Sequence, residues 1–192
     1  KERNSMDRPL RRALEESHLI AAVKDEAQLR RALESPCGIV FLLFGDICSL
    51  PGMVDQVRKS GRLAIVHLDL VTGLSQKSIA VDFVRQAGAD GVITTRALLA
   101  RRARELGLIT VLRIFAIDSM AIQNLRREQL QVQPDLIELM PGIIPKVIAR
   151  VAAETAVPSI AGGLITDKSD VLAALSAGAV GISTSREELW RA

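Results

Sequence analysis

The chain has 192 residues and a formal net charge of +3, with 48% hydrophobic but only 3% aromatic residues, so it can bury a substantial core of aliphatic side chains, as parallel strands covered by helices do. No apolar run approaches the roughly 18 residues that span a bilayer, and the charged N-terminus lacks the apolar stretch of a secretory signal. The 2 Cys support neither a disulfide framework nor a C-x-x-C metal site, so we expect a cytoplasmic protein with no membrane association and no metal.

The N-terminal segment comes before any repeating pattern. "DRPLRRALEESH" predicts a helix with Asp7 as its N-cap and Pro9 near the first turn. We expect residues 1–17 to form a tail and this helix, which lies across the bottom of a single domain formed by residues 18–192.

From residue 19 onward, eight short apolar runs each precede an amphipathic segment. The runs occupy residues 19–23, 38–44, 62–70, 90–95, 108–117, 135–140, 158–163 and 179–185. They are rich in Val and Ile, as buried parallel strands are, and the segments "KSG", "QAG", "ELG" and "SAG" predict helices that end at left-handed glycines. Eight such units favour an α/β fold closed into a compact (β/α)8 TIM-type barrel. An open doubly wound sheet is the alternative, but its G-x-G-x-x-G fingerprint is absent after the first strand.

Small residues follow the last two predicted strands, in "SIAGG" and "GISTS". In barrels that bind phosphate, the loops after strands seven and eight and the N-terminus of a short helix supply the anion site. The candidate phosphate ligands are Gly162, Gly163, Ser183, Thr184 and Ser185, with Lys24 and Arg113 as fixed cations. For Arg113 a structural ion pair with Glu138 on the adjacent strand is an alternative, and the two roles are compatible.

Further polar side chains stand near the predicted strand ends. They are Asp46, His67, Asp69, Thr94 and Glu138, which we assign to the pocket around the ligand. His67 and Asp69 are two residues apart, which places them on one face of a strand. They could form an acid/base pair, or a metal cluster with Asp46 and Glu138, but neither interpretation is compelling, and Asp69 can instead accept hydrogen bonds from the hydroxyls of a polyol.

Six segments of the chain, in collinear order, carry a resemblance to a known family. They are "AAVKD", "VHLDLVTGL", "GVITTR", "PDLIELMPGIIPKVI", "VPSIAGGLI" and "AVGISTS". The set, above all "H-x-D-L-x-x-G-L" with "E-x-M-P-G-I-x-P", resembles the glycerol uptake operon antiterminator regulatory proteins, which are bacterial antiterminators that respond to glycerol-3-phosphate. The similarity runs from about Leu19 to the C-terminus and leaves the N-terminal helix and tail outside.

The resemblance implies a regulator of transcription rather than an enzyme, with no cofactor. Its ligand would be glycerol-3-phosphate and its partner the leader mRNA of glycerol-catabolism genes, where it lets transcription pass a terminator. Carried over to this chain, the phosphate would contact Gly162, Gly163, Ser183 and Thr184, and Lys24, Asp69, Arg113 and Glu138 would complete the pocket.

The surface for RNA is expected to be basic rather than aromatic. With 4 Phe, 1 Trp and no Tyr, recognition by base stacking is disfavoured, and arginine contacts to the RNA backbone are expected instead. The candidates are Arg101, Arg102 and Arg104 in the helical segment 96–107, with Arg96 at its start, where a bound ligand could order the loop. The alternative is an ordinary solvated outer helix.

Two other functions stay open from the sequence. One is a phosphosugar isomerase, epimerase or aldolase on the same barrel, for which Lys24 is the only lysine at a predicted strand end. The other is a sensor of a phosphorylated ligand that acts through a protein partner. The sequence also leaves open whether the protein forms a homo-oligomer.

Overall fold

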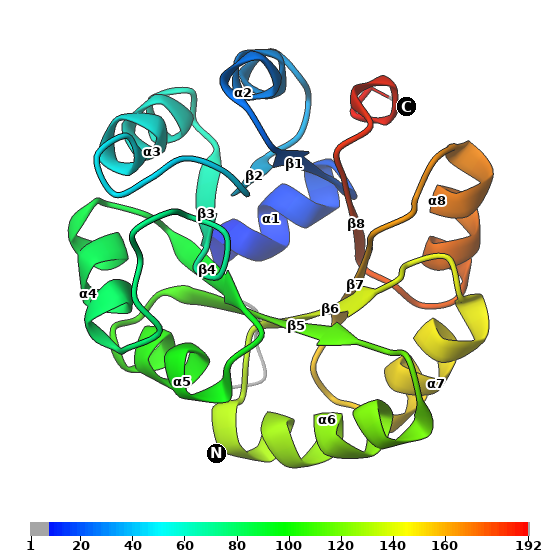
Figure 1. Cartoon of the computed structure of the whole chain (residues 1–192). Helices are drawn as coiled ribbons and strands as arrows, with labels where there is room; N and C mark the ends of the chain where they lie inside the picture. The colour runs from blue at the N-terminus through cyan, green and yellow to red at the C-terminus, as the bar shows by residue number, and fades with distance from the viewer. Residues whose placement is uncertain (1–7, 192) are drawn as a thin grey trace.

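The computed structural model describes residues 8–191 of the chain, and of residues 119 and 126–130 only the backbone. Within this range, eight parallel strands close into a barrel in the order β1 to β8, and helices surround it on the outside (Figure 1). The strands are β1 (Leu19–Val23), β2 (Ile39–Leu42), β3 (Leu63–His67), β4 (Gly91–Thr94), β5 (Ile109–Phe115), β6 (Leu136–Met140), β7 (Ser159–Gly162) and β8 (Gly181–Thr184). The helices are α1 (Arg8–Glu16), α2 (Glu26–Leu33), α3 (Leu50–Lys59), α4 (Ile79–Gln86), α5 (Ala97–Glu105), α6 (Ser119–Val132), α7 (Pro145–Glu154) and α8 (Lys168–Ser176), followed by the 3₁₀ helix η1 (Glu187–Leu189).

The alternation of side chains along the strands divides the core into two parts. One set of aliphatic residues packs between the strands and the surrounding helices, and includes Ala21, Val40 and Val66. The residues between them in sequence, such as Phe41 and Ile65, point into the barrel and form a second cluster. Because both faces of each strand are buried, the strands consist of continuous apolar runs, which is the pattern the sequence shows. The predicted (β/α)8 barrel with an extra N-terminal helix is confirmed.

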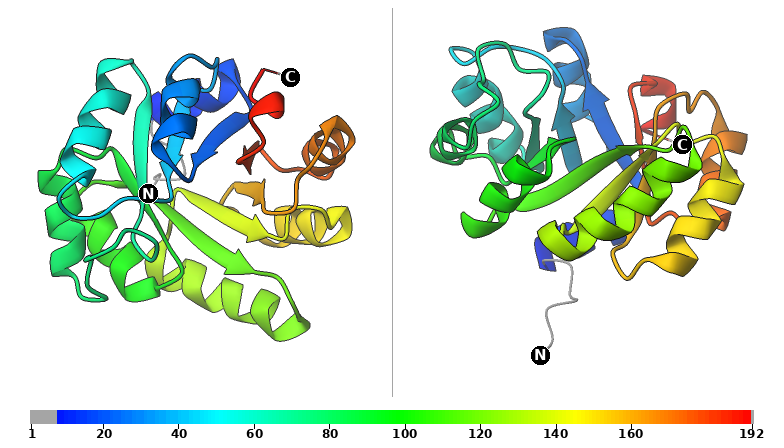
Figure 2. Two further views of the ribbon diagram at one scale, coloured as in Figure 1. Left: turned by 45° about the horizontal axis from the view of Figure 1, so that its top comes forward. Right: turned by 60° about the horizontal axis from the view of Figure 1, so that its bottom comes forward.

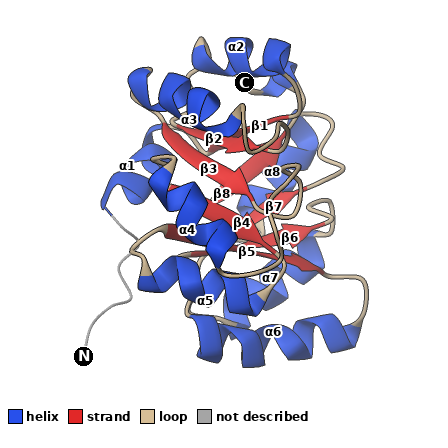
Figure 3. Ribbon diagram, turned by 60° about the vertical axis from the view of Figure 1, so that its left-hand side comes forward, coloured by secondary structure: helices blue, strands red, loops and turns tan. Residues whose placement is uncertain are grey.

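Helix α1 closes the end of the barrel at which the strands begin (Figure 3). Its apolar residues Leu10, Ala13 and Leu14 follow helical spacing, so they form one buried stripe, and they pack into the same cluster as the barrel interior. The fit is close. A Cβ atom added at Gly38, just before β2, would lie 3.1 Å from Ala13, and one added at Gly181, the first residue of β8, would lie 2.9 Å from Leu14. Asp7, the predicted N-cap of this helix, lies outside the described residues.

The helices α2 to α8 stand around the barrel, as the two tilted views of Figure 2 show. Four of the loops that leave them contain the predicted left-handed glycines, Gly61, Gly88, Gly107 and Gly178, with φ between +71° and +104°. In the described part of the chain no helix is both long and apolar enough to span a membrane.

The structure differs from the sequence prediction at the last unit and at the third strand. The segment after β8 is only the short 3₁₀ turn η1, because the buried Trp190 folds back and donates its indole N–H to the carbonyl of Thr184 at 2.8 Å. Strand β3 ends at His67, so Asp69 lies in a turn rather than on the strand. The two-residue alternation therefore does not explain how His67 and Asp69 come together.

Candidate functional site

The carboxyl ends of the strands form the end of the barrel that α1 leaves open, which we call the mouth. The interior-facing positions follow from the alternation that places Ile65, Val111, Leu136 and Ile160 inside. Counting two residues onward along each strand, the residues that face the interior near the mouth are His67, Arg113, Glu138 and Gly162, and Ser183 joins them from β8. The strands β3, β5, β6 and β8 thus bring polar side chains to one place, as the barrel fold predicts.

Arg113 and Glu138 form a buried ion pair across the paired strands β5 and β6. They are register partners, and the Nε of Arg113 donates to Oε2 of Glu138 at 2.6 Å, with side-chain exposures of 10% and 0%. The other carboxylate oxygen, Oε1, accepts from the Ser183 hydroxyl at 2.5 Å. Both oxygens are therefore bonded, which compensates for removing this carboxylate from water. The terminal Nη groups of Arg113 have no partner among the described residues. The ion-pair alternative for Arg113 is confirmed, and its cationic end is still available to a ligand.

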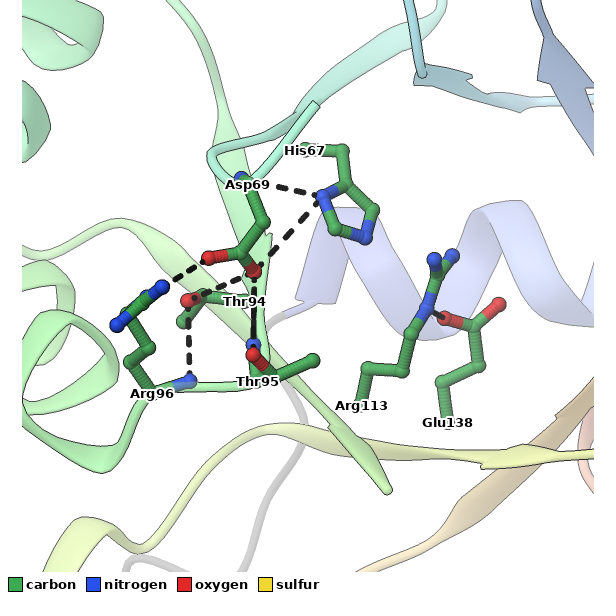
Figure 4. A network of polar contacts seen from close by, with 7 residues as sticks. All are labelled: His67, Asp69, Thr94, Thr95, Arg96, Arg113 and Glu138. Carbon is green, nitrogen blue, oxygen red and sulfur yellow. Dashed lines mark hydrogen bonds and ion pairs between the residues drawn. The ribbon is translucent and has the colours of Figure 1, made fainter. Parts of the chain in front are cut away.

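His67 is buried as a neutral side chain. Its pKa is lowered to about 4, because burial disfavours the charged ring and the nearby Arg113 adds repulsion that outweighs the attraction of Asp69. The Nδ1 atom accepts the backbone N–H of Asp69 at 3.3 Å. A neutral ring that accepts at Nδ1 carries its proton on Nε2, and this Nε2–H has no partner in the described structure. Figure 4 shows the imidazole between Asp69 on one side and the guanidinium of Arg113 on the other.

Asp69 holds the loop that starts α5 (Figure 4). Its Oδ2 accepts from the amide of Thr95 at 3.0 Å and its Oδ1 accepts from Nε of Arg96 at 3.1 Å. The hydroxyl of Thr94 adds a longer bond to Oδ2 at 3.3 Å and also accepts the amide of Arg96 at 3.1 Å. The carboxylate that we expected to receive polyol hydroxyls is therefore already bonded to the protein. Thr94 lies on the helix-facing side of β4 and supports the loop rather than the interior.

The turns after β7 and β8 are built around close backbone approaches. A Cβ atom at Gly162 would lie 2.6 Å from both Oε1 of Glu138 and the hydroxyl of Ser183, so only glycine leaves room for that hydrogen bond. Gly163 has φ +74° and would place a Cβ 2.6 Å from Met140. The amide of Gly142, in the loop after β6, donates to the carbonyl of Gly162 at 2.6 Å. Gly162 therefore makes room for the buried carboxylate of Glu138 and its hydrogen bond with Ser183, a role that the sequence did not indicate.

The hydroxyls at the end of β8 differ in what they leave for a ligand. Ser183 donates to Glu138, as described above. Thr184 points away from the interior, where its hydroxyl donates to the carbonyl of Ile165 at 3.4 Å and accepts the amide of Arg186 at 3.1 Å. The hydroxyls of Ser183 and Thr184 are therefore bonded to the protein, and the assignment of these two residues to the phosphate stays a prediction. Ser185, which is half-buried, makes no side-chain hydrogen bond within the described residues, and it remains the hydroxyl candidate.

Gln28 joins the ends of β1 and β8. Its side-chain oxygen accepts the amide of Lys24 at 2.9 Å, and its side-chain nitrogen donates to the carbonyl of Ser185 at 3.3 Å. The Lys24 side chain is exposed at this edge of the mouth. Sequence reasoning missed Gln28, although Asp25 at the N-cap followed three residues later by Gln is a recognisable helix-start pattern.

Asp46 has a local structural role. It accepts from the amides of Ser49 at 2.9 Å and Cys48 at 2.8 Å, and these bonds lower the pKa of its carboxyl. Among the side chains that the structure describes, no three His, Cys, Asp or Glu come together as a metal site. The cluster of Asp46, His67, Asp69 and Glu138 that the sequence left open is therefore not formed.

The arginines of α5 are mostly engaged with neighbouring elements. Arg102 bonds to Asp82 of α4 at 2.5 Å, and hydrogen bonding to Asp82 and Glu105 raises its pKa. Arg104 bonds to Asp135, before β6, at 3.1 Å. Arg101 is exposed and makes no ion pair with another described residue. The four predicted RNA contacts thus separate into Arg96, Arg102 and Arg104, which hold the structure together, and Arg101, which is available.

Comparison with known proteins agrees with the resemblance drawn from the sequence motifs. A family model described as "Glycerol-3-phosphate responsive antiterminator" matches residues 19–190. The chain belongs to this family. The uncharacterized protein YgcP of Escherichia coli (strain K12) is 37% identical over 183 residues, which make up 95% of this chain and 96% of that protein.

Solved structures of antiterminator proteins show the same fold. The crystal structure of the glycerol uptake operon antiterminator regulatory protein from Listeria monocytogenes str. 4b F2365 has 32% identity and a TM-score of 0.86, and covers 90% of this chain and 94% of that chain. An antiterminator-related protein from Thermotoga maritima MSB8 has 32% identity and a TM-score of 0.80, with 90% and 96% covered. An aldolase with 12% identity and a TM-score of 0.72, with 90% and 91% covered, shares the fold alone.

Proposed function

We propose that the protein is a glycerol-3-phosphate-responsive transcription antiterminator that acts in the cytoplasm on the leader mRNA of glycerol-catabolism genes. The observation that carries this proposal is the family match over residues 19–190. The mouth of the barrel supports it, because small-residue turns end the neighbouring strands β7 and β8, and the exposed Lys24 lies at the same edge.

In this proposal the ligand phosphate binds at the turns after β7 and β8. Gly163 and Ser185 are both half-buried at this edge, so backbone N–H groups and one hydroxyl can face an anion. Gln28 holds the end of β1 against Ser185, which keeps Lys24 near the same turn. Backbone donors with one flexible cation form the kind of site that phosphate-binding barrels use at these two strands.

We propose that the protein binds this ligand without turning it over. The carboxylates of Asp46, Asp69 and Glu138 are bonded to the protein, so none is a free general base. His67 is neutral but has its proton on the nitrogen that faces the interior, so it can donate there and not accept. Lys24 is exposed at the rim rather than enclosed as a Schiff-base lysine would be.

For RNA we propose contacts to the phosphate backbone through the outer surface of α5, with Arg101 as its available cation. Steep weakening of binding with salt is expected, because such contacts release counterions. The start of the same helix is fastened to Asp69 at the mouth, so a ligand there lies next to the element that bears Arg101.

A thermal-shift panel tests the ligand. Glycerol-3-phosphate should raise the melting temperature in a concentration-dependent way, since a ligand that binds only the folded state stabilises it by mass action. Glycerol at the same concentration should have no effect. An equal response to both compounds, or to neither, would contradict the phosphate site. Incubation of the protein with glycerol-3-phosphate, followed by NMR, tests turnover, and a product that depends on the protein would favour the enzyme alternative.

Affinity for leader RNA, measured with and without glycerol-3-phosphate, tests the regulatory role. We expect the ligand to tighten RNA binding and RNA to tighten ligand binding by the same factor, because coupling free energies are reciprocal. Arg101→Ala should weaken RNA binding, whereas the matched control Arg11→Ala, an exposed arginine on α1 at the opposite end of the barrel, should not. Ligand binding with no RNA binding under any condition would instead favour a protein partner.

A further inference from the structure

Two hydrogen-bond donors at the mouth have no acceptor in the described structure. His67 is 2% exposed, and its Nε2–H is buried without a partner. Arg113 is bonded through Nε only, which leaves its two Nη groups unpaired. Buried donors are nearly always bonded in folded proteins, so the buried and unpaired Nε2–H of His67 points to an acceptor that binds there.

The position of the His67 donor is fixed by the fold. The amide of Asp69 occupies Nδ1 and sets the tautomer, while the carboxylate of the same residue is held by Thr95 and Arg96. The other buried side-chain atom without a partner, Oγ of Ser159, lies at the first residue of β7, next to the interior-facing Ile160 and on the opposite face. Of these donors, those of His67 and Arg113 therefore face the interior near the mouth, and in Figure 4 they lie next to each other.

The charges around these donors indicate what kind of group they bind. The positive charge of Arg113 is matched by Glu138, and that of Arg96 by Asp69. His67 is neutral. The interior between β3 and β5 therefore has donors but no uncompensated positive charge, and a second anion placed there would lack a counter-charge. A neutral oxygen, such as a hydroxyl, is the acceptor that fits.

We infer that the carbon chain of the ligand extends from the phosphate turns toward β3 and β5, where its central hydroxyl oxygen accepts from Nε2–H of His67 and from Arg113. This rests on the proposed function for the phosphate end and adds the residues that select the other end. The site then prefers a phosphorylated polyol over a phosphate ester that lacks the central hydroxyl, and over one that carries a carboxylate in place of the terminal hydroxymethyl group.

Isothermal titration calorimetry with matched ligands tests the inference. Glycerol-3-phosphate is compared with propane-1,3-diol monophosphate, which lacks the central hydroxyl, and with 3-phosphoglycerate, which carries a carboxylate. Wild-type protein should bind glycerol-3-phosphate about tenfold or more tightly than the deoxy compound, as expected for one lost hydrogen bond that leaves a buried donor unpaired. The preference over 3-phosphoglycerate should be of the same order or larger.

Two substitutions at one position provide the matched control. The side-chain nitrogen of glutamine can take the place of Nε2, whereas that of asparagine reaches only as far as Nδ1. His67→Gln should keep much of the preference for glycerol-3-phosphate over the deoxy compound, and His67→Asn should reduce the affinity ratio to about one. Circular dichroism establishes that both variants are folded, and should either one fail to fold, the wild-type ligand ratios decide.

The outcomes separate this inference from the proposed function. If the wild-type protein binds inorganic phosphate and all three esters equally, the phosphate site stands and the inference is overturned. The same holds if His67→Asn retains the full preference. If the wild-type protein binds none of these compounds, both are overturned.

Discussion

Gly162 offers a direct test of how the mouth is packed. Replacing it with alanine adds one Cβ atom that would lie 2.6 Å from Oε1 of Glu138 and 2.6 Å from the Ser183 hydroxyl, whereas ordinary contacts begin at 3.4 Å. Both atoms belong to a fully buried hydrogen bond with little room to move. Inserting a carbon into a well-packed interior typically costs about 1–3 kcal/mol. For a domain of this size that corresponds to a fall in melting temperature of about 2–12 °C.

Two other glycines separate this collision from the general effect of adding a methyl group. Gly52, in α3, has nothing within 4 Å of an added Cβ, so Gly52→Ala should stabilise the protein by about 0.5–1 kcal/mol through helix propensity. Gly107 is equally open but has φ +71°, so Gly107→Ala should cost about 1–2 kcal/mol from backbone strain alone.

Urea unfolding of the wild type and these three variants provides the free energies of unfolding. Gly162→Ala should also weaken the thermal response to glycerol-3-phosphate, because the displaced carboxylate no longer holds Arg113 in place. The reasoning is refuted if Gly162→Ala is as stable as the wild type, or as stable as Gly52→Ala. In that case the carboxylate and hydroxyl would have room that the structure does not give them.

Three further predictions concern the buried histidine, the bottom of the barrel and the ion pairs of α5. The pKa of His67 is lowered to about 4 in the folded state, so the unfolded chain takes up the proton first. The free energy of unfolding therefore has its full value above about pH 6.5 and falls by about 3 kcal/mol as the pH drops toward 4. Urea unfolding should show that His67→Gln lacks this pH dependence. Leu10→Ala, at a fully buried position in α1, should lower the free energy of unfolding by about 2–5 kcal/mol. Arg102→Ala should lower the melting temperature by a margin that shrinks in high salt, since its pair with Asp82 is partly exposed, whereas Arg101→Ala should leave the melting temperature unchanged.

The fold could be predicted from the sequence because every unit repeats the same local signals. A Val- and Ile-rich run, an amphipathic segment and a closing glycine recur along the chain, and eight repeats favour closure. The exception is the final segment, where the buried indole of Trp190 bonds to the end of β8. That contact is tertiary, so the helical pattern of the segment could not reveal it.

The sequence predicted where the site lies, at the carboxyl ends of the strands, but it predicted few of the hydrogen-bond partners of the individual side chains. The strand-end positions of Arg113 and Glu138 indicated their pairing, and the structure confirms it. Thr184 could have been excluded by counting alternation from its neighbour Ser183. By contrast, Asp69 is occupied by the amide of Thr95, 26 residues away, and Arg104 is held by Asp135, 31 residues away. No local pattern encodes such partners, because they depend on which loops the barrel brings together.

The packing of α1 against the strands has a kinetic consequence for ligand exchange. Since Leu10 and Leu14 fill the end at which the strands begin, a molecule bound inside the barrel enters and leaves through the mouth. Its dissociation rate then depends on whatever lies over the mouth. An RNA or a protein bound across the mouth would lengthen the residence time of the ligand without making any contact with it. A regulator built in this way could stay in its liganded state for as long as its target remains bound, even after the free concentration of the ligand has fallen.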